Sequence, residues 1–380
     1  MRLETLLVHA GEPQPRIAGA VAMPVFQSST FVEQGDRGYH DIAYARLSNT
    51  PNHLALHAKL AALEGAEAAV ATSSGMSAIS TALLSLLGAG DHLLAQDTLY
   101  GGTHDLFTRD LPRLGVEVTF VDPQAPRSWE SQVKRNTRAV YFETLTNPLL
   151  QVADLEAAAT FARGHGLVAL IDNTFATPIG FRPLEHGFDL ALHSATKYLN
   201  GHSDLIAGAV MGSAARIEAV KHKLDHLGGS LDPHACFLLH RGLKTLALRF
   251  RQQSDTALRI ARFLSDQPAV ARVNHPGLSS HPQHDRARRL FPAGMGGMLS
   301  FELRGGRDAA EALLRRVRIP LHAPSLGGPE TLLTRPAATS HSGLTAEARR
   351  ALGISDGLVR MSVGLEAADD LLEDLAQALA

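Results

Sequence analysis

The 380-residue sequence contains a single cysteine and few aromatic side chains, 5% of the total. One cysteine, Cys236, cannot form an intramolecular disulfide, which excludes a disulfide-stabilised scaffold and is typical of a reducing compartment. No stretch approaches the roughly 18 continuous apolar residues of a membrane-spanning helix, and the N-terminus has no apolar signal core. These absences predict a cytoplasmic protein with no membrane partner.

The chain also lacks an excess of charge of either sign. Its 36 basic and 38 acidic residues give a net charge of −2, so we expect no general attraction to nucleic acid. Hydrophobic residues make up 45% and charged residues 19%, which is ordinary for a globular protein. Because single cores stop growing at roughly 250–300 residues, the length predicts two or more domains.

Short apolar runs alternate with longer amphipathic segments over residues 56–227. This alternation predicts an α/β domain around a mostly parallel sheet, assigned to residues 56–235. The strand-like runs include Val70, His92–Ala95, Val116–Val121, Val140–Phe142 and Val168–Ile171.

The ends of the chain have different patterns. Residues 1–55 are rich in proline, glycine and polar side chains and are expected to form an extended arm. A break at Asp232-Pro233 precedes a long helical segment, expected over residues 236–264. Short strand-like runs with helices between them follow, which predicts a smaller α+β domain over residues 236–380.

A lysine between hydroxyl residues forms the most informative motif, Ser194-Ala195-Thr196-Lys197. Upstream, an apolar run ends at Asp172. A pyridoxal phosphate (PLP) enzyme needs both groups: the lysine for a Schiff base with the aldehyde, the aspartate to keep the ring nitrogen protonated. Ser194 and Thr196 would then donate to the phosphate. Each part alone has a plainer explanation, an ordinary loop for the lysine and a helix N-cap for Asp172.

Three further loops follow strand-like runs. Residues 68–72 lead into Ser73-Ser74-Gly75-Met76 and a helical pattern, and a helix start of this kind binds anions. The second loop carries Tyr100 between polar and glycine residues, and the third carries Asn147. Because ligands bind outside the carboxyl ends of parallel strands, we expect these loops to surround one site.

With these motifs in place, the chain resembles the trans-sulfuration family of PLP-dependent enzymes. That family contains cystathionine γ-synthase, cystathionine γ- and β-lyases and methionine γ-lyase. The resemblance extends from Thr5–Gly11 to Leu358–Glu366 and so covers nearly the whole chain. It implies the aspartate-aminotransferase-like fold (fold type I), bound PLP, and a homotetramer made of two dimers with shared active sites.

The resemblance also implies a role for each candidate residue. Lys197 anchors PLP and then, as a base, moves protons between Cα, Cβ and the cofactor. Tyr100 stacks on the ring that Asp172 holds and relays a proton to the leaving sulfur. Gly75, Met76, Ser194 and Thr196 complete the cofactor set within the chain.

Two parts of the site lie far from that core in the sequence. Tyr44 and Arg46, in the N-terminal arm, are expected to bind the cofactor phosphate of a neighbouring subunit, for which a guanidinium is well suited. Arg360, with Asn147 and Ser325, is expected to bind the substrate α-carboxylate. The alternative for Arg360 is a buried structural salt bridge.

Substrate choice depends on fewer residues. Pro324 precedes Ser325 where relatives that bind cystathionine commonly place a glutamate, and Gly102 stands where many methionine γ-lyases carry cysteine. We expect a carbon–sulfur lyase that γ-eliminates methionine, or next cystathionine, to 2-oxobutanoate, ammonia and a thiol. The alternatives are γ-replacement, as in cystathionine γ-synthase or an O-acyl-homoserine sulfhydrylase, β-elimination, and a PLP-binding protein without turnover.

No metal site is expected. His53 and His57 have the i, i+4 spacing of zinc ligands, but no third ligand or catalytic glutamate accompanies them. They are interpreted as surface histidines of a helix.

Overall fold

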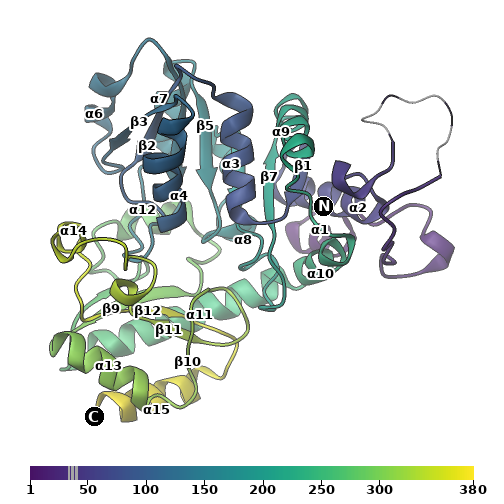
Figure 1. The fold of residues 1–380 in the computed structure, drawn as a ribbon. Helices are drawn as coiled ribbons and strands as arrows, with labels where there is room; N and C mark the ends of the chain where they lie inside the picture. Colours follow the sequence, from purple (N-terminus) through teal and green to yellow (C-terminus); the bar gives the residue numbers. More distant parts are fainter. Residues whose placement is uncertain (33–34, 36–37, 39–41) are drawn as a thin grey trace.

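A seven-stranded sheet forms the centre of the larger part of the protein (Figure 1). The computed structural model describes the whole chain except residues 33–34, 36–37 and 39–41. The strand order is β1-β7-β6-β5-β4-β2-β3, and β7 alone among these strands runs antiparallel to both of its neighbours. The strands are β1 Ala68–Thr72, β2 His92–Gln96, β3 Glu117–Val121, β4 Thr137–Glu143, β5 Val168–Asp172, β6 Leu190–His193 and β7 Gly208–Gly212.

Helices cover both faces of this sheet. Helices α3 (Gly75–Leu86) and α9 (Ala214–Leu227) pack on one face, where their apolar side chains form a core with Val70, Leu192 and other strand residues. Helices α2 (Pro51–Glu64) and α7 (Leu155–Gly164) cover the opposite face. Because both faces are covered, the central strands are mostly apolar, as in β5 (VALID), where only the last residue, Asp172, is polar. The predicted mostly parallel α/β sheet is confirmed.

A second sheet of five strands, ordered β10-β11-β12-β9-β8, lies in the C-terminal part (Figure 1). Three helices pack together beside it: α11 (Leu246–Ser265), α13 (Gly306–Arg316) and α15 (Ala368–Leu379). Its strands are β8 Val270–Asn274, β9 Met298–Leu303, β10 Leu321–His322, β11 Leu332–Thr334 and β12 Leu358–Ser362.

The helix expected over residues 236–264 is instead two helices, α10 (Pro233–Leu243) and α11, separated at Lys244 and Thr245. A Cβ at Gly242, one residue before the end of α10, would lie 2.3 Å from the carbonyl oxygen of Asn200, so the helix here packs directly on the loop after Lys197. The predicted domain border at residue 235 falls inside α10 and stays a prediction.

The N-terminal segment is not wholly extended, contrary to the expectation. Residues Leu3–His9 form helix α1, and Leu7 is buried in a core that includes α2. The cause is local: three leucines in this segment have helical spacing. Lys59 of α2 reinforces the contact by donating from Nζ to the carbonyl oxygen of Leu7 at 2.8 Å.

The interpretation of His53 as a surface residue was also wrong. His53 is fully buried in α2, with one ring nitrogen 2.7 Å from Thr50 Oγ1 and the other 2.7 Å from the carbonyl oxygen of Leu231. Both nitrogens of the ring therefore have structural partners. Among the described helices, none has the length and apolar character needed to cross a membrane.

Candidate active site

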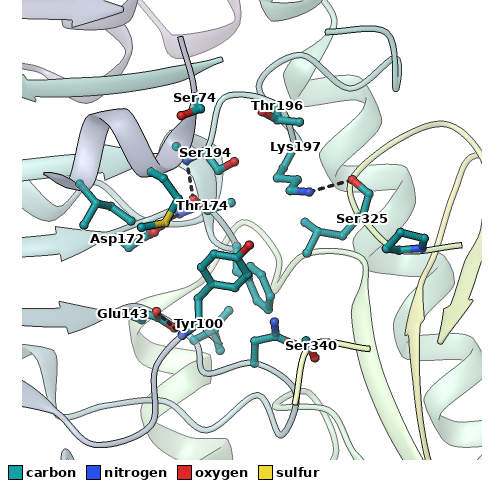
Figure 2. A pocket seen from close by; sticks show the side chains of 18 of the residues that line it. Ser74, Tyr100, Glu143, Asp172, Thr174, Ser194, Thr196, Lys197, Ser325 and Ser340 are labelled. Atoms are coloured by element: carbon teal, nitrogen blue, oxygen red, sulfur yellow. Dashed lines mark hydrogen bonds between the residues drawn. The ribbon is translucent and has the colours of Figure 1, made fainter. Parts of the chain in front are cut away.

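A cavity of about 510 Å³ lies beyond the carboxyl ends of β4 and β5, with walls from both the larger and the C-terminal parts of the chain (Figure 2). Strands β4 to β6 are parallel neighbours, so the loops after them open on the same edge of the sheet. The lining includes all but two of the predicted site residues: Gly75, Met76, Tyr100, Asn147, Asp172, Ser194, Thr196, Lys197, Ser325 and Arg360.

Lys197 occupies the turn after β6 and points into the cavity, where its Nζ donates to Ser325 Oγ at 2.8 Å (Figure 2). Burial, and in addition the charge of Arg360, lower the pKa of Lys197 to about 8. Both causes disfavour the ammonium form. A substantial fraction of this amine is therefore neutral near pH 8, as a nucleophile or base requires.

Ser325 reaches Lys197 from a strained loop. Its φ of 93° lies in the left-handed region that side chains other than glycine rarely occupy. The guanidinium of Arg360 holds the loop by donating from Nη2 to the Ser325 carbonyl oxygen at 3.0 Å. Pro324, which has a fixed φ, precedes the strained residue and also lines the cavity.

Asp172 is the last residue of β5, and its Oδ1 accepts from the Thr174 amide at 2.9 Å. Burial raises the pKa of Asp172, while the bonds from Thr174 oppose that rise. The carboxyl lines the cavity, as the sequence predicted, and it does not cap a helix, because the next helix begins at Thr177.

Two hydroxyl groups of the expected phosphate site, those of Ser74 and Thr196, form hydrogen bonds with backbone groups of this chain. Ser74 caps the helix, accepting from the amide of Ser77 at 3.0 Å. Thr196 donates from Oγ1 to the carbonyl oxygen of Ala207 at 3.1 Å and accepts from its amide at 3.0 Å. The Thr196 hydroxyl thus joins the turn after β6 to the segment that contains Ala207, and these bonds help to shape the cavity wall.

Tyr100 immediately precedes helix α4 (Gly101–Asp105), and its ring extends into the cavity (Figure 2). A Cβ at Gly102 would lie 2.7 Å from Tyr100 Cε1 and 3.1 Å from Met76 Sδ. Any side chain at position 102 would therefore displace the tyrosine ring or Met76. Glycine here keeps the ring in its present position.

Arg360, in the middle of β12, is buried at 7% exposure. Its guanidinium donates to Asn147 Oδ1 at 3.2 Å and to Ser325, and its Nε has no partner in the described part of the chain. No carboxylate of the described residues forms an ion pair with it, so the alternative of an internal salt bridge is not observed there. A buried guanidinium at a cavity wall is suited to an incoming carboxylate.

Tyr44 and Arg46 are the two predicted residues that do not line the cavity of their own chain. Arg46 donates from Nη1 to the Asp225 carbonyl oxygen of α9 at 2.5 Å, and its guanidinium lies 5.7 Å from the Tyr44 ring centroid. Their predicted role, in the site of a neighbouring subunit, stays a prediction.

Several lining residues were not assigned from the sequence, among them Glu143, Thr174, Phe175, Thr339 and Ser340. Glu143 carried a usable signal, because it closes β4 just as Asp172 closes β5. Thr339 and Ser340 lie far along the chain from every motif, so only the fold brings them to the cavity.

Comparison with known proteins gives one consistent result. A family model described as "Cys/Met metabolism PLP-dependent enzyme" matches residues 4–380. Cystathionine γ-lyase of Bacillus subtilis is 43% identical over 100% of this chain and 99% of its own. L-methionine γ-lyase of Fusobacterium nucleatum is 43% identical over 99% of this chain and 98% of its own. The crystal structure of cystathionine γ-lyase from Lactobacillus plantarum, complexed with L-serine, superposes with a TM-score of 0.94 at 38% identity, over 100% of this chain and 98% of that one.

The residues of the cavity fit PLP. An amine at Lys197 suits the aldehyde, the carboxyl of Asp172 suits the ring nitrogen, and the start of α3 suits the phosphate. Gly75 makes this last part a narrow cradle, because a Cβ there would lie 2.7 Å from Ser194 Cβ. Only glycine allows the helix start and the Ser194 turn to approach so closely.

The lowered pKa of Lys197 predicts how cofactor capture depends on pH. The rate of PLP binding to cofactor-free protein should rise with pH through a midpoint at about pH 8 and level off above it, since the neutral amine reacts. In Arg360→Gln the midpoint should move upward, because one of the two causes of the shift is removed. Stopped-flow absorbance measures the rate, with Lys197→Ala as the blank. A midpoint near the ordinary lysine value of 10.5 would contradict this account.

Proposed function

Because the chain belongs to the Cys/Met metabolism family of PLP-dependent enzymes and is a carbon–sulfur lyase, we propose that it catalyses γ-elimination of a sulfur amino acid. Methionine is the favoured substrate and cystathionine the next. With methionine, one water is consumed, and the products are 2-oxobutanoate, ammonia and methanethiol. The observation that carries the proposal is the convergence of the Lys197 amine, the Asp172 carboxyl and the Arg360 guanidinium on one cavity.

The residues divide the work as follows. Arg360 and Asn147 bind the substrate carboxylate, which fixes the amino acid with Cα toward Lys197. Bound PLP supplies the electron sink for negative charge that develops at the substrate carbons. Lys197 then takes the proton from Cα and moves protons at Cβ, and Ser325 Oγ holds its Nζ within the cavity. The Tyr100 hydroxyl delivers a proton to the leaving sulfur.

The preference for methionine rests on the cavity wall beside Ser325. Cystathionine carries a second ammonium and carboxylate at its distal end, and recognising them requires charged or polar partners. Pro324 lines the cavity and offers no acceptor side chain for an ammonium. Gly102 does not add to this preference, because it leaves the Tyr100 ring in place but carries no thiol where many methionine γ-lyases have a cysteine.

Product analysis tests the reaction type. The PLP-loaded protein is incubated with methionine, cystathionine, cysteine and O-acetylhomoserine, with and without an added thiol. We expect 2-oxobutanoate and methanethiol from methionine. Pyruvate from cystathionine as the main activity would identify a β-lyase, and thioether formation from O-acetylhomoserine plus thiol would identify a replacement enzyme. A PLP spectrum with no keto acid from any substrate would identify a binding protein without turnover.

Replacing Pro324 with Glu should raise the preference for cystathionine over methionine. A charge-assisted hydrogen bond is worth about 1.5–3 kcal/mol, which corresponds to roughly one to two orders of magnitude in relative kcat/KM. Pro324→Gln is the matched control, because it removes the proline without adding a charge. If the wild-type enzyme already cleaves cystathionine about a hundredfold more efficiently than methionine, a gap of roughly 2.7 kcal/mol, the role given to Pro324 is wrong.

The assembly is proposed to be a cytoplasmic homotetramer of two dimers, each with two shared active sites. Its support is the position of Tyr44 and Arg46 outside their own cavity, together with the single, buried cysteine Cys236. Mixing inactive Arg46→Ala with inactive Lys197→Ala subunits should restore activity, since each hybrid dimer contains one site with both residues intact. If subunit exchange is confirmed and activity stays absent, Arg46 acts within its own chain.

A further inference from the structure

Glu143 is a second carboxyl group at the edge of the sheet where Asp172 lies. It closes β4, pairs in register with Asp172 of the neighbouring strand β5, and is buried at 5% exposure. Its side chain lies on the same face of β4 as that of Tyr141, two residues earlier, whose ring packs edge-on against Phe107 at 5.1 Å. The mechanism above gives Glu143 no task, although it lines the cavity.

The Glu143 carboxyl makes a direct contact with the loop that carries the aromatic ring of the site. Its Oε1 accepts from the backbone amide of Tyr100 at 2.7 Å (Figure 2). The amide of Glu143 in turn donates to Gln96 Oε1 of β2 at 2.9 Å. The Tyr100 amide has no partner within a helix, because Tyr100 stands just before the first residue of α4. The position of the Tyr100 backbone therefore depends on Glu143.

The charge of the pair also matters, because two neighbouring carboxyls that are both partly desolvated do not ionise together without a penalty. Burial, and after it the neighbouring Asp172, raise the pKa of Glu143 well above its usual range. The pKa of Asp172 is also raised by burial, but the bonds from Thr174 and the nearby His193 oppose that rise. Tyr141 and Thr103 contribute buried hydroxyls to the same region. The larger rise at Glu143 favours the proton on Glu143 and the negative charge on Asp172.

We propose that Glu143 is a positioning residue of this active site: as a neutral acid it fixes the Tyr100 backbone, and it leaves Asp172 as the single carboxylate at the pyridine nitrogen. The inference rests on the cofactor assignment made above. It assigns the contact, not the charge, of Glu143 as the feature that the site requires. An uncharged side chain of the same shape should therefore preserve the function of Glu143.

Three substitutions separate contact from charge. Glu143→Gln keeps an oxygen acceptor at the same distance and is permanently neutral. Glu143→Asp keeps the carboxyl but is one methylene shorter, so it withdraws from the Tyr100 amide. Glu143→Ala removes both. PLP affinity is measured by titrating the cofactor-free protein, and the orientation of the bound ring by visible circular dichroism. Melting of the cofactor-free proteins reports on the fold.

We expect Glu143→Gln to match the wild type in dichroism, with a Kd for PLP within about threefold, which is under 0.7 kcal/mol. Glu143→Asp and Glu143→Ala should share an altered dichroism band and bind PLP roughly tenfold more weakly, as for one lost hydrogen bond.

Two results would overturn the proposal. Wild-type behaviour of Glu143→Ala would show that the contact positions nothing. Wild-type behaviour of Glu143→Asp, with a defect in Glu143→Gln, would show that the charge is required. If the alanine variant does not fold, the comparison of the Gln and Asp variants still decides between contact and charge. Failure of the wild-type protein itself to bind PLP would instead contradict the cofactor assignment.

Discussion

Desolvation of ionisable side chains at one edge of the larger sheet is the constraint on which this active site depends. Lys197, Asp172, Glu143 and Arg360 all line one cavity, and loss of solvent shifts the pKa of each. Burial lowers the pKa of both Lys197 and Arg360 and raises that of both acids, so each charged form is disfavoured. The amine of Lys197 is therefore partly neutral near pH 8. The guanidinium of Arg360 pairs with no carboxylate of the described residues, so it is suited to bind an incoming one.

The surrounding fold keeps these groups in place. Parallel pairing of β4 with β5 sets Glu143 beside Asp172, and the next parallel strand, β6, leads into the turn of Lys197. The second sheet contributes Arg360 from the middle of β12, so the cavity exists only where the two parts of the chain meet. The strained backbone of Ser325 is held between Lys197 and Arg360, which links the proton-transferring amine to the carboxylate-binding pocket.

Much of this arrangement could be predicted from the sequence, because its signals are local. A carboxylate that ends an apolar strand and a lysine beside hydroxyl residues are visible in a few positions. The errors arose where tertiary contacts decide the outcome. The helix expected to continue past residue 243 ends where Gly242 packs against Asn200. His53, expected at the surface, is buried and hydrogen-bonded to Thr50 and Leu231. Glu143 was visible but was not distinguished from other loop residues, since its significance depends on the register with Asp172.

The central claim, that the cofactor is held by the amine of Lys197 at this cavity, has a direct chemical test. The PLP-loaded protein is reduced with borohydride, digested and mapped by mass spectrometry, which records where the cofactor has become covalently attached. The account predicts the added mass on the peptide that contains Lys197 and on no other. Attachment to a different lysine, such as the buried Lys59 of α2 or Lys244, would contradict it.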